Sequence, residues 1–326
     1  MGNKSLQNFE FAKFRFYLQP KDKIHLPYYE GSTLRGGFGN IFKEVVCISR
    51  ERDCSRCILK GKCAYSYVFE TICTDNVNVS YQSIKYPHPF IIEPLSEGKY
   101  EYSPNNEIVF NLILVGKGID YLPYFLFVYN ELGARGLGRN RGKYTLRKVE
   151  SVLNDKFDLA ETIYTSESAT LLDTYEIRTF AEIEQKTGYS NCKSISLQFV
   201  SPTRIVYRGK LTIDIDFEIL IRNLLRRIGL LSELHCGEKL NLDFKGLLRK
   251  AKEGKTTKRN LLWREMERYS SRQREKMKLG GFVGNITFKG DLGEFISFIK
   301  LGEYVHVGKA TSFGLGKYRI IDLQRD

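Results

Sequence analysis

The sequence predicts an α+β protein made of two ferredoxin-like βαββαβ halves in tandem. Along the 326 residues, one order of elements occurs twice: strand, helix, strands, helix, glycine-rich turn, strand. Each copy closes on Gly-Leu-Gly, a basic residue and a strand, at residues 136–139 and again at 314–317. A duplicated βαββαβ unit explains both observations.

In the first half, alternating apolar residues over 9–18 predict a strand, with a helix over 33–46 capped by Ser32. The apolar run 108–115 predicts another strand, and residues 121–132 predict a helix or buried segment before the glycine-rich turn. Further extended segments are expected at residues 65–69, 77–84, 90–94 and 143–153.

In the second half, residues 217–234 form the clearest amphipathic pattern of the chain. Leu220, Leu224 and Ile228 recur on its apolar face, which predicts a helix. Strands are expected at residues 194–202, 282–288 and 318–323, with a helix at 292–299.

These elements divide the chain into three parts. Residues 1–155 are expected to form an N-terminal ferredoxin-like domain that carries a four-cysteine insertion at 47–63. Residues 156–193 are weakly patterned and indicate a linker region. Residues 194–326 are expected to form a C-terminal ferredoxin-like domain with a glycine-rich loop.

The net charge of +13 indicates an anionic partner. Residues 245–278 hold thirteen Lys or Arg against four Glu, and residues 135–148 hold six basic residues and no acid. The sequence contains no run of 18 apolar residues, so no membrane span is expected. Seven Cys without a secretory signal argue against a disulfide framework and favour the cytoplasm.

Both glycine-rich turns suit phosphate binding, because glycine lets an anion approach backbone amides closely. Flanking cations are Lys309 and Lys317 in the second turn and three arginines around the first. Each turn precedes a strand, which excludes a dinucleotide-binding fingerprint, and neither has the Walker spacing. The alternative interpretation is a tight packing turn.

Several motifs resemble the CRISPR repeat-processing endoribonucleases of the RAMP superfamily. Four stretches resemble the C-terminal half of that family: RYSSRQ at 268–273, GGFVG at 280–284, GDL at 290–292 and HVGKATSFGLGKY at 306–318. Residues 26–39, LPYYEGSTLRGGFG, are similar to the family's first helix and the turn before it. The resemblance covers most of the chain, and the C-terminal motif is its specific part.

The resemblance implies metal-independent cleavage of RNA, in which the ribose 2′-OH attacks the adjacent phosphate. The products are a 2′,3′-cyclic phosphate and a 5′-OH, and the reaction needs a base, an acid and cations at the phosphorane. His25 and His306 are the preferred candidates for the base, although a lone His is more often structural. Because the family varies its catalytic residues, Tyr28, Tyr29, Arg35 and Lys43 stay open.

RNA contacts are expected from cations and glycines of the basic segments, the first helix and both turns. These are Arg35, Arg135, Arg139, Arg141, Arg268, Arg272, Arg274, Gly308, Lys309, Gly314, Gly316 and Lys317.

The cysteines Cys47, Cys54, Cys57 and Cys63 follow one another within a short segment. Four thiolates at such spacing can close a tetrahedral zinc site, which would order a loop with few apolar residues. An iron–sulfur cluster is a weaker alternative, and reduced thiols are the plain one. Four Cys ligands leave no open position, so zinc is expected to be structural.

Two functions within one family are compatible with these sequence features. The chain is expected to be the endoribonuclease that cuts CRISPR precursor transcripts; the alternative is a non-catalytic RAMP subunit that holds guide RNA in an effector complex. A zinc-dependent nucleic-acid-binding regulator is disfavoured by the C-terminal motif. Expected partners are CRISPR repeat RNA and other CRISPR effector subunits, and a homodimer stays open.

Overall fold

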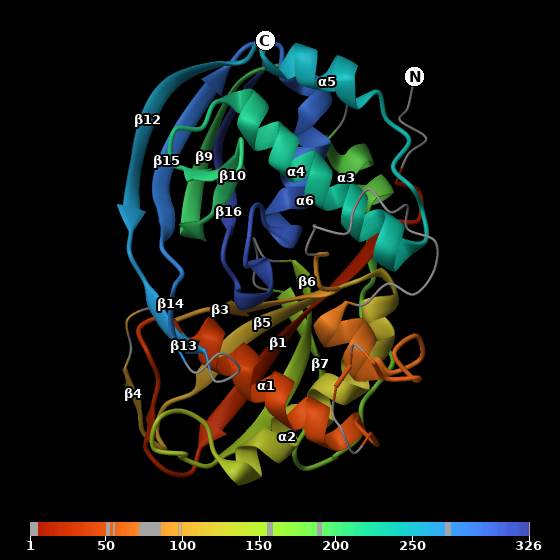
Figure 1. Cartoon of the computed structure of the whole chain (residues 1–326), viewed down its shortest axis with the longest axis vertical. Helices are drawn as coiled ribbons and strands as arrows, with labels where there is room; N and C mark the ends of the chain where they lie inside the picture. Colours follow the sequence, from red (N-terminus) through yellow and green to blue (C-terminus); the bar gives the residue numbers. More distant parts are fainter. Residues whose placement is uncertain are drawn as a thin grey trace. The chain divides into compact units, whose positions relative to one another are not determined.

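The computed structural model describes residues 6–49, 53–54, 56–71, 86–96, 98, 100–154, 159–187, 191–270 and 275–325. Its chain forms two compact units. The N-terminal unit is Phe11–Ile177, and the C-terminal unit joins the residues up to Glu10 with those from Arg178 onward. Both units are ferredoxin-like, which confirms the predicted α+β tandem fold (Figure 1).

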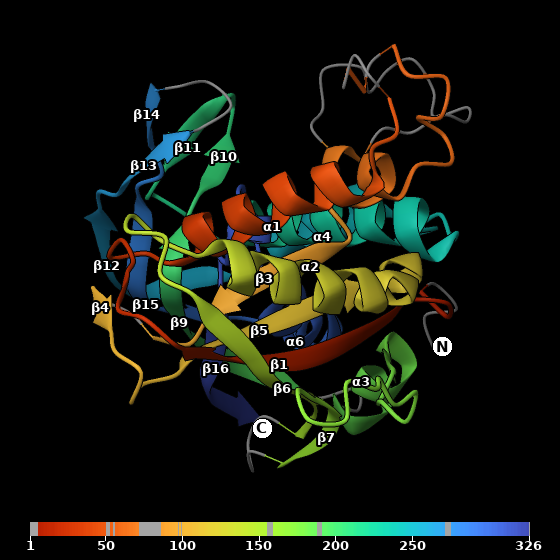
Figure 2. The ribbon, with the colours of Figure 1, turned by 90° about the horizontal axis from the view of Figure 1, so that it is seen from below.

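The N-terminal unit is built around one antiparallel sheet and two helices. Its elements are β1 (Glu10–Pro20), β2 (Ile24–His25), α1 (Gly31–Val46), a π-helical turn (Ser66–Glu70), β3 (Phe90–Pro94), β4 (Glu101–Tyr102), β5 (Ile108–Val115), a 3₁₀ turn (Gly116–Tyr121), α2 (Leu122–Arg135), β6 (Tyr144–Asn154) and β7 (Leu159–Thr165). The sheet order β3-β5-β1-β6 is that of a ferredoxin-like fold, and β7 extends it. Figure 2 shows α1 and α2 side by side.

Aromatic side chains fill the core between these helices and the sheet. The rings of Phe38 on α1 and Phe125 on α2 stack with centroids 4.2 Å apart, and Phe16 of β1 lies fully buried in the same cluster. Burying one such side chain contributes roughly 1.5–3 kcal/mol. Gly37 lets the helices approach, because a Cβ there would lie 2.8 Å from Leu132.

The C-terminal unit repeats the arrangement. Its elements are β8 (Arg178–Thr179), α3 (Phe180–Thr187), β9 (Cys192–Thr203), β10 (Ile205–Tyr207), β11 (Lys210–Thr212), α4 (Phe217–Leu231), a π-helical turn (Ser232–Cys236), α5 (Phe244–Ala251), β12 (Lys255–Arg264), β13 (Glu267–Ser270), β14 (Glu275–Lys278), β15 (Gly281–Lys289), a 3₁₀ turn (Gly293–Phe295), α6 (Ile296–Val305), a 3₁₀ turn (Thr311–Phe313) and β16 (Tyr318–Arg325). The sheet order β12-β15-β9-β16 again gives the ferredoxin-like pattern.

Helix α4 illustrates how local sequence positions an element of this unit. The Asp216 carboxylate accepts a hydrogen bond from the Ile219 amide at 2.7 Å and caps the helix start. Phe217, at the first position, packs edge-on against Phe288 of β15 and Phe295. The predicted amphipathic helix is therefore confirmed.

Some local expectations were wrong. Residues 65–69 were expected as extended, but Ser66–Glu70 form a π-helical turn in which Ser66 and Val68 are buried. The Ser32 hydroxyl does not cap α1, whose N-cap position is Glu30. Residues 156–193, expected as a linker region, contain β7 and α3. The extended segment expected at 77–84 lies outside the described residues.

No helix within the described part of the chain combines the length and apolar character needed to cross a membrane.

Candidate nucleic-acid interface

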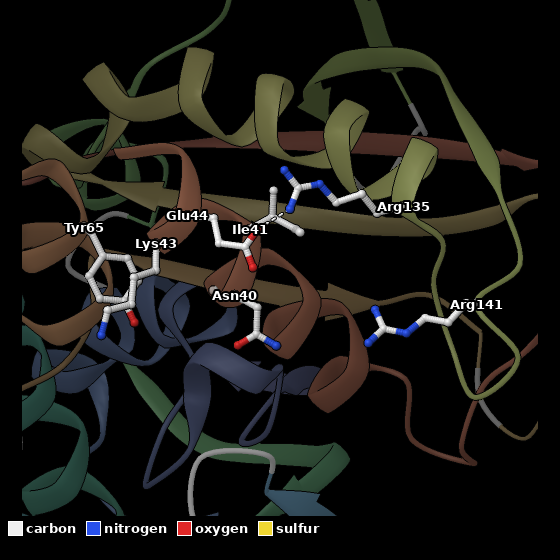
Figure 3. A pocket seen from close by; sticks show the side chains of 8 residues that line it. Asn40, Ile41, Lys43, Glu44, Tyr65, Arg135 and Arg141 are labelled. Carbon is white, nitrogen blue, oxygen red and sulfur yellow. Dashed lines mark hydrogen bonds and ion pairs between the residues drawn. The ribbon is translucent and has the colours of Figure 1, made fainter. Parts of the chain in front are cut away.

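An open pocket of about 310 Å³ lies beside α1 in the N-terminal unit (Figure 3). Its lining holds three cationic side chains against one carboxylate. The lining residues are Gly39, Asn40, Ile41, Lys43, Glu44, Tyr65, Arg135 and Arg141. We call this space the basic pocket.

The cations of the basic pocket differ in how they are engaged. Arg135, at the end of α2, forms an ion pair with Glu44. The Nζ of Lys43 lies 5.4 Å from the centre of the Tyr65 ring. Arg141 is exposed and makes no ion pair with a described residue. Figure 3 shows Lys43 and Tyr65 on one side and Arg141 on the other. A phosphate between them would meet cations from both sides.

The first glycine-rich turn brings Arg141 and His25 into one region. The His25 carbonyl accepts the Arg139 amide at 3.0 Å, and its own amide donates to the Asn140 side chain at 3.0 Å. A Cβ at Gly138 would lie 2.3 Å from the His25 oxygen. This glycine is therefore required so that strand β2 can pack against the turn.

His25 and Glu101 form a dyad across β2 and β4. The Nε2 of His25 lies 2.8 Å from the Glu101 carboxylate, and both side chains are about half exposed. An ionised carboxylate only accepts, so Nε2 carries a proton, and in the neutral imidazole Nδ1 then keeps its lone pair. No described residue bonds to that Nδ1.

The charge of Glu101 is stabilised by its neighbours. Its pKa is lowered by hydrogen bonds from His25 first and then from Lys23, whose Nζ lies 3.2 Å away. Glu101 therefore stays ionised at neutral pH and holds the imidazole in one tautomer.

His306, the other favoured histidine, is fully buried. Its Nδ1 lies 3.0 Å from the Leu315 carbonyl, and its amide donates to Gly302 at the end of α6. This histidine ties the helix end to the second glycine-rich turn, and its ring has no route to solvent.

The second turn, residues 308–316, is packed and not open. The amides of Lys309 and Gly316 donate to the carbonyls of Arg204 and Pro202 at 2.9 and 3.1 Å. A Cβ at Gly316 would lie 1.9 Å from the Val307 oxygen. Gly314 and Gly316 are buried, Gly308 and Lys317 are half-buried, and Lys309 is exposed. The packing interpretation thus holds for most of this turn.

Arg268 packs against the second turn. Its guanidinium carbon lies 4.7 Å from the Phe313 ring centre, and it donates to the Met277 sulfur at 3.2 Å. Desolvation by burial lowers the pKa of Arg268. Arg272 and Arg274 lie outside the described residues.

The remaining predicted residues lie apart from the basic pocket lining. Tyr28 is 40% exposed with its ring 6.0 Å from that of Tyr100, whereas Tyr29 is buried. The Arg35 guanidinium lies 4.2 Å from the Phe69 ring centre and 2.9 Å from the Nε2 of His88. Arg35 is therefore engaged within the fold.

The four predicted zinc ligands meet at a second, small pocket. Cys47, Cys54, Cys57 and Cys63 all line it, and all four are free thiols. The pKa of Cys54 is raised because burial outweighs the lowering effect of nearby Lys43. Among the described residues, no three thiols, imidazoles or carboxylates are already arranged as a metal site.

Sequence reasoning missed Glu101, Asn40, Glu44 and Tyr65. Glu101 lies 76 positions from His25 in a two-residue strand, so no local pattern could pair them. Asn40 could have been found from its helical spacing to Lys43 and Glu44, since residues three or four apart share a face.

Comparisons with known proteins agree with this architecture. Residues 9–176 match the family model AF_1859_N, an N-terminal domain, and residues 197–318 match the CRISPR-associated endoribonuclease Cas6. An uncharacterized protein of Archaeoglobus fulgidus is 23% identical over 91% of this chain and 93% of its own.

Solved structures share the fold. A Cas6 product complex has a TM-score of 0.59 at 15% identity, over 95% of this chain and 99% of that one. A partial Cas6-RT-Cas1–Cas2 complex has a TM-score of 0.58 at 11% identity, over 97% of this chain and 46% of that one. At these identities the likeness concerns the fold.

Proposed function

We propose that this chain, which belongs to the AF_1859_N family and to the Cas6 family of CRISPR-associated repeat-processing endoribonucleases of the RAMP superfamily, binds CRISPR repeat RNA and cuts precursor transcripts. The observation that supports a reaction centre in the N-terminal unit is the His25–Glu101 dyad. Its Nδ1 faces no described partner, and its backbone is hydrogen-bonded to the turn that carries Arg139 and Arg141.

The proposed reaction is an internal transfer of the phosphoryl group. The Nδ1 of His25 accepts the proton of a ribose 2′-OH, and the 2′-oxygen forms a bond to the adjacent phosphorus. The bond from phosphorus to the 5′-oxygen breaks, and that oxygen takes up a proton. The products are a 2′,3′-cyclic phosphate and a 5′-OH, with no water consumed in this step.

The basic pocket supplies the charge that this reaction needs. The phosphorane gains negative charge as the 2′-oxygen attacks, and prearranged cations lower its energy. Lys43 and Arg141 lie on opposite sides of the pocket, so together they suit this role (Figure 3). His306 receives no catalytic part, because its ring is buried.

The test is cleavage of a labelled repeat RNA in EDTA by wild type, His25→Ala and Lys23→Ala. Removing a general base should slow cleavage roughly 100-fold or more while RNA binding is kept. Lys23→Ala is the comparison variant: it removes a cation beside Glu101 but leaves the imidazole in place, so it should slow cleavage far less than His25→Ala.

Three outcomes separate the candidate functions. A single cut that leaves a cyclic phosphate supports the enzyme. Tight binding without any product supports instead the non-catalytic subunit that holds guide RNA. Normal cleavage by His25→Ala removes this residue from the reaction and leaves Lys43 and Tyr28 as candidates.

Partners beyond RNA are also proposed from the relatives. A fold-related chain occurs in a Cas6-RT-Cas1–Cas2 complex, so other CRISPR-associated subunits are reasonable partners for this chain. Co-purification of tagged protein with the other subunits would test this.

A further inference from the structure

The segment from Cys47 to Cys63 leaves the end of α1 and returns to the fold at the π-helical turn. It has little core of its own, since Ile58 is 98% exposed and Ile48 is 82% exposed. Its described internal bonds are short-range, such as the Cys63 amide to the Leu59 carbonyl at 2.9 Å. A segment that buries so little apolar surface needs another source of order.

The four thiols of this segment surround one small space. Cys47, Cys54, Cys57 and Cys63 line a cavity of about 20 Å³. A space of this size holds about one water-sized sphere. It therefore has room for a single ion.

Ser66 provides an independent observation at the same place. Its side chain lines the cavity and is 1% exposed, yet its hydroxyl oxygen has no hydrogen-bond partner among the residues that the structure describes. A buried hydroxyl without a partner costs roughly 1–3 kcal/mol. A thiolate would satisfy it, because sulfur ligands of a metal usually accept hydrogen bonds from the surrounding shell.

We propose that the four cysteines bind one Zn²⁺ as a closed, structural site. Four soft thiolates select zinc over magnesium or calcium, and they leave no position for a reacting water. Lys60 lines the same cavity and offsets part of the negative charge of the thiolates. Among the described residues, no three ligands already stand in coordination positions, so the ion must draw the thiols inward as it binds.

The site is also placed to brace the basic pocket. Tyr65 lines both the cysteine cavity and the basic pocket. Cys47 follows directly on the last turn of α1, which carries Lys43. The ion would therefore hold one wall of the pocket, and this second effect rests on the proposed function, whereas metal binding itself does not.

The first experiment measures metal on the whole purified chain. Elemental analysis after reconstitution with Zn²⁺ under reducing conditions should give about one zinc per chain, and Co²⁺ in its place should give the visible bands of a tetrahedral thiolate site. Zn²⁺ should protect the four cysteines from alkylation. No bound metal with all thiols still reactive, or iron with the colour of a cluster, overturns the proposal.

The second experiment uses variants. Cys57→Ser should lose the zinc and lower Tm, whereas the matched control Cys236→Ser, in the other unit, should keep one zinc per chain. Ser66→Ala should weaken zinc affinity roughly 10-fold or more. If Cys57→Ser does not fold, alkylation protection in the wild type still decides. Equal zinc content in Cys57→Ser and Cys236→Ser would reject these ligands.

RNA binding then separates the two parts of the inference. Loss of zinc should weaken binding of repeat RNA by wild-type protein. If zinc binds but its removal leaves RNA affinity unchanged, the metal site stands and its link to the basic pocket falls. If the wild type binds no repeat RNA at all, the proposed function fails while the zinc measurement still holds.

Discussion

The two glycine-rich turns share Gly-Leu-Gly and a basic residue, yet they differ in what they expose. In the first turn, Arg139 and Arg141 are exposed, and Arg141 lines the basic pocket. In the second turn, most backbone is buried, and Lys317 is half-buried. The same sequence pattern therefore forms an exposed cationic surface that can contact phosphate in the N-terminal unit, and a tightly packed turn in the C-terminal unit.

Glycine is required for the same physical reason in both turns. A Cβ at Gly138 or Gly316 would collide with a carbonyl oxygen, and both residues have a positive φ, of 78° and 79°. Close packing of backbone, not the approach of an anion, requires glycine at these positions. What distinguishes the turns is the placement of their cations.

The largest expected effect concerns packing. Gly316→Ala places a Cβ against the Val307 oxygen and should lower the free energy of unfolding by about 3 kcal/mol. Gly209→Ala is the matched control, because Gly209 has a φ of 80° and open space, and it should cost only about 1–2 kcal/mol. Urea unfolding measures both, and equal losses would contradict a packed second turn.

The next effect concerns the dyad beside the first turn. Glu101→Gln can donate to Nε2 of His25 and so favour the tautomer that carries the proton on Nδ1. Cleavage should slow about 10-fold while RNA binding is kept. Single-turnover cleavage is the measurement, and an unchanged rate would show that Glu101 does not orient the base.

The same dyad predicts a dependence of stability on pH. Because the pKa of Glu101 is lowered in the folded chain, its interaction stabilises the fold above the ordinary carboxyl pKa. This contribution is lost as pH falls through the lowered pKa. Wild type and Glu101→Gln should therefore differ in Tm at neutral pH and converge in acid; a constant difference would reject the assignment.

The smallest effect compares the cations of the two turns. Arg141→Ala should reduce the salt dependence of RNA binding by about one unit of slope, because one phosphate contact is lost. Lys317→Ala, in the packed turn, should change the slope less. Binding across a salt series measures both, and an equal or larger change for Lys317→Ala would show that the second turn binds phosphate after all.

Much of the fold could be predicted because its signals are local. The apolar run 108–115 and the helical periodicity of residues 217–234 predicted β5 and α4, and the duplicated order of elements indicated the ferredoxin-like class. Residues 65–69 were missed because a short aromatic run fits a strand as well as a helical turn. The start of the chain was assigned to the first half, yet the Phe9 carbonyl accepts the Phe180 amide in the C-terminal unit.

For the candidate site, too, the sequence predicted some features and only the folded structure showed others. The kinds of group available could be read from the residues in order: four histidines, clustered cations, four spaced cysteines and two glycine-rich turns. That His25 pairs with Glu101 in the open, while His306 is buried against Leu315, follows only from the folded chain. Burial and long-range pairing depend on how distant segments pack, whereas the chemistry of a side chain is set by its identity.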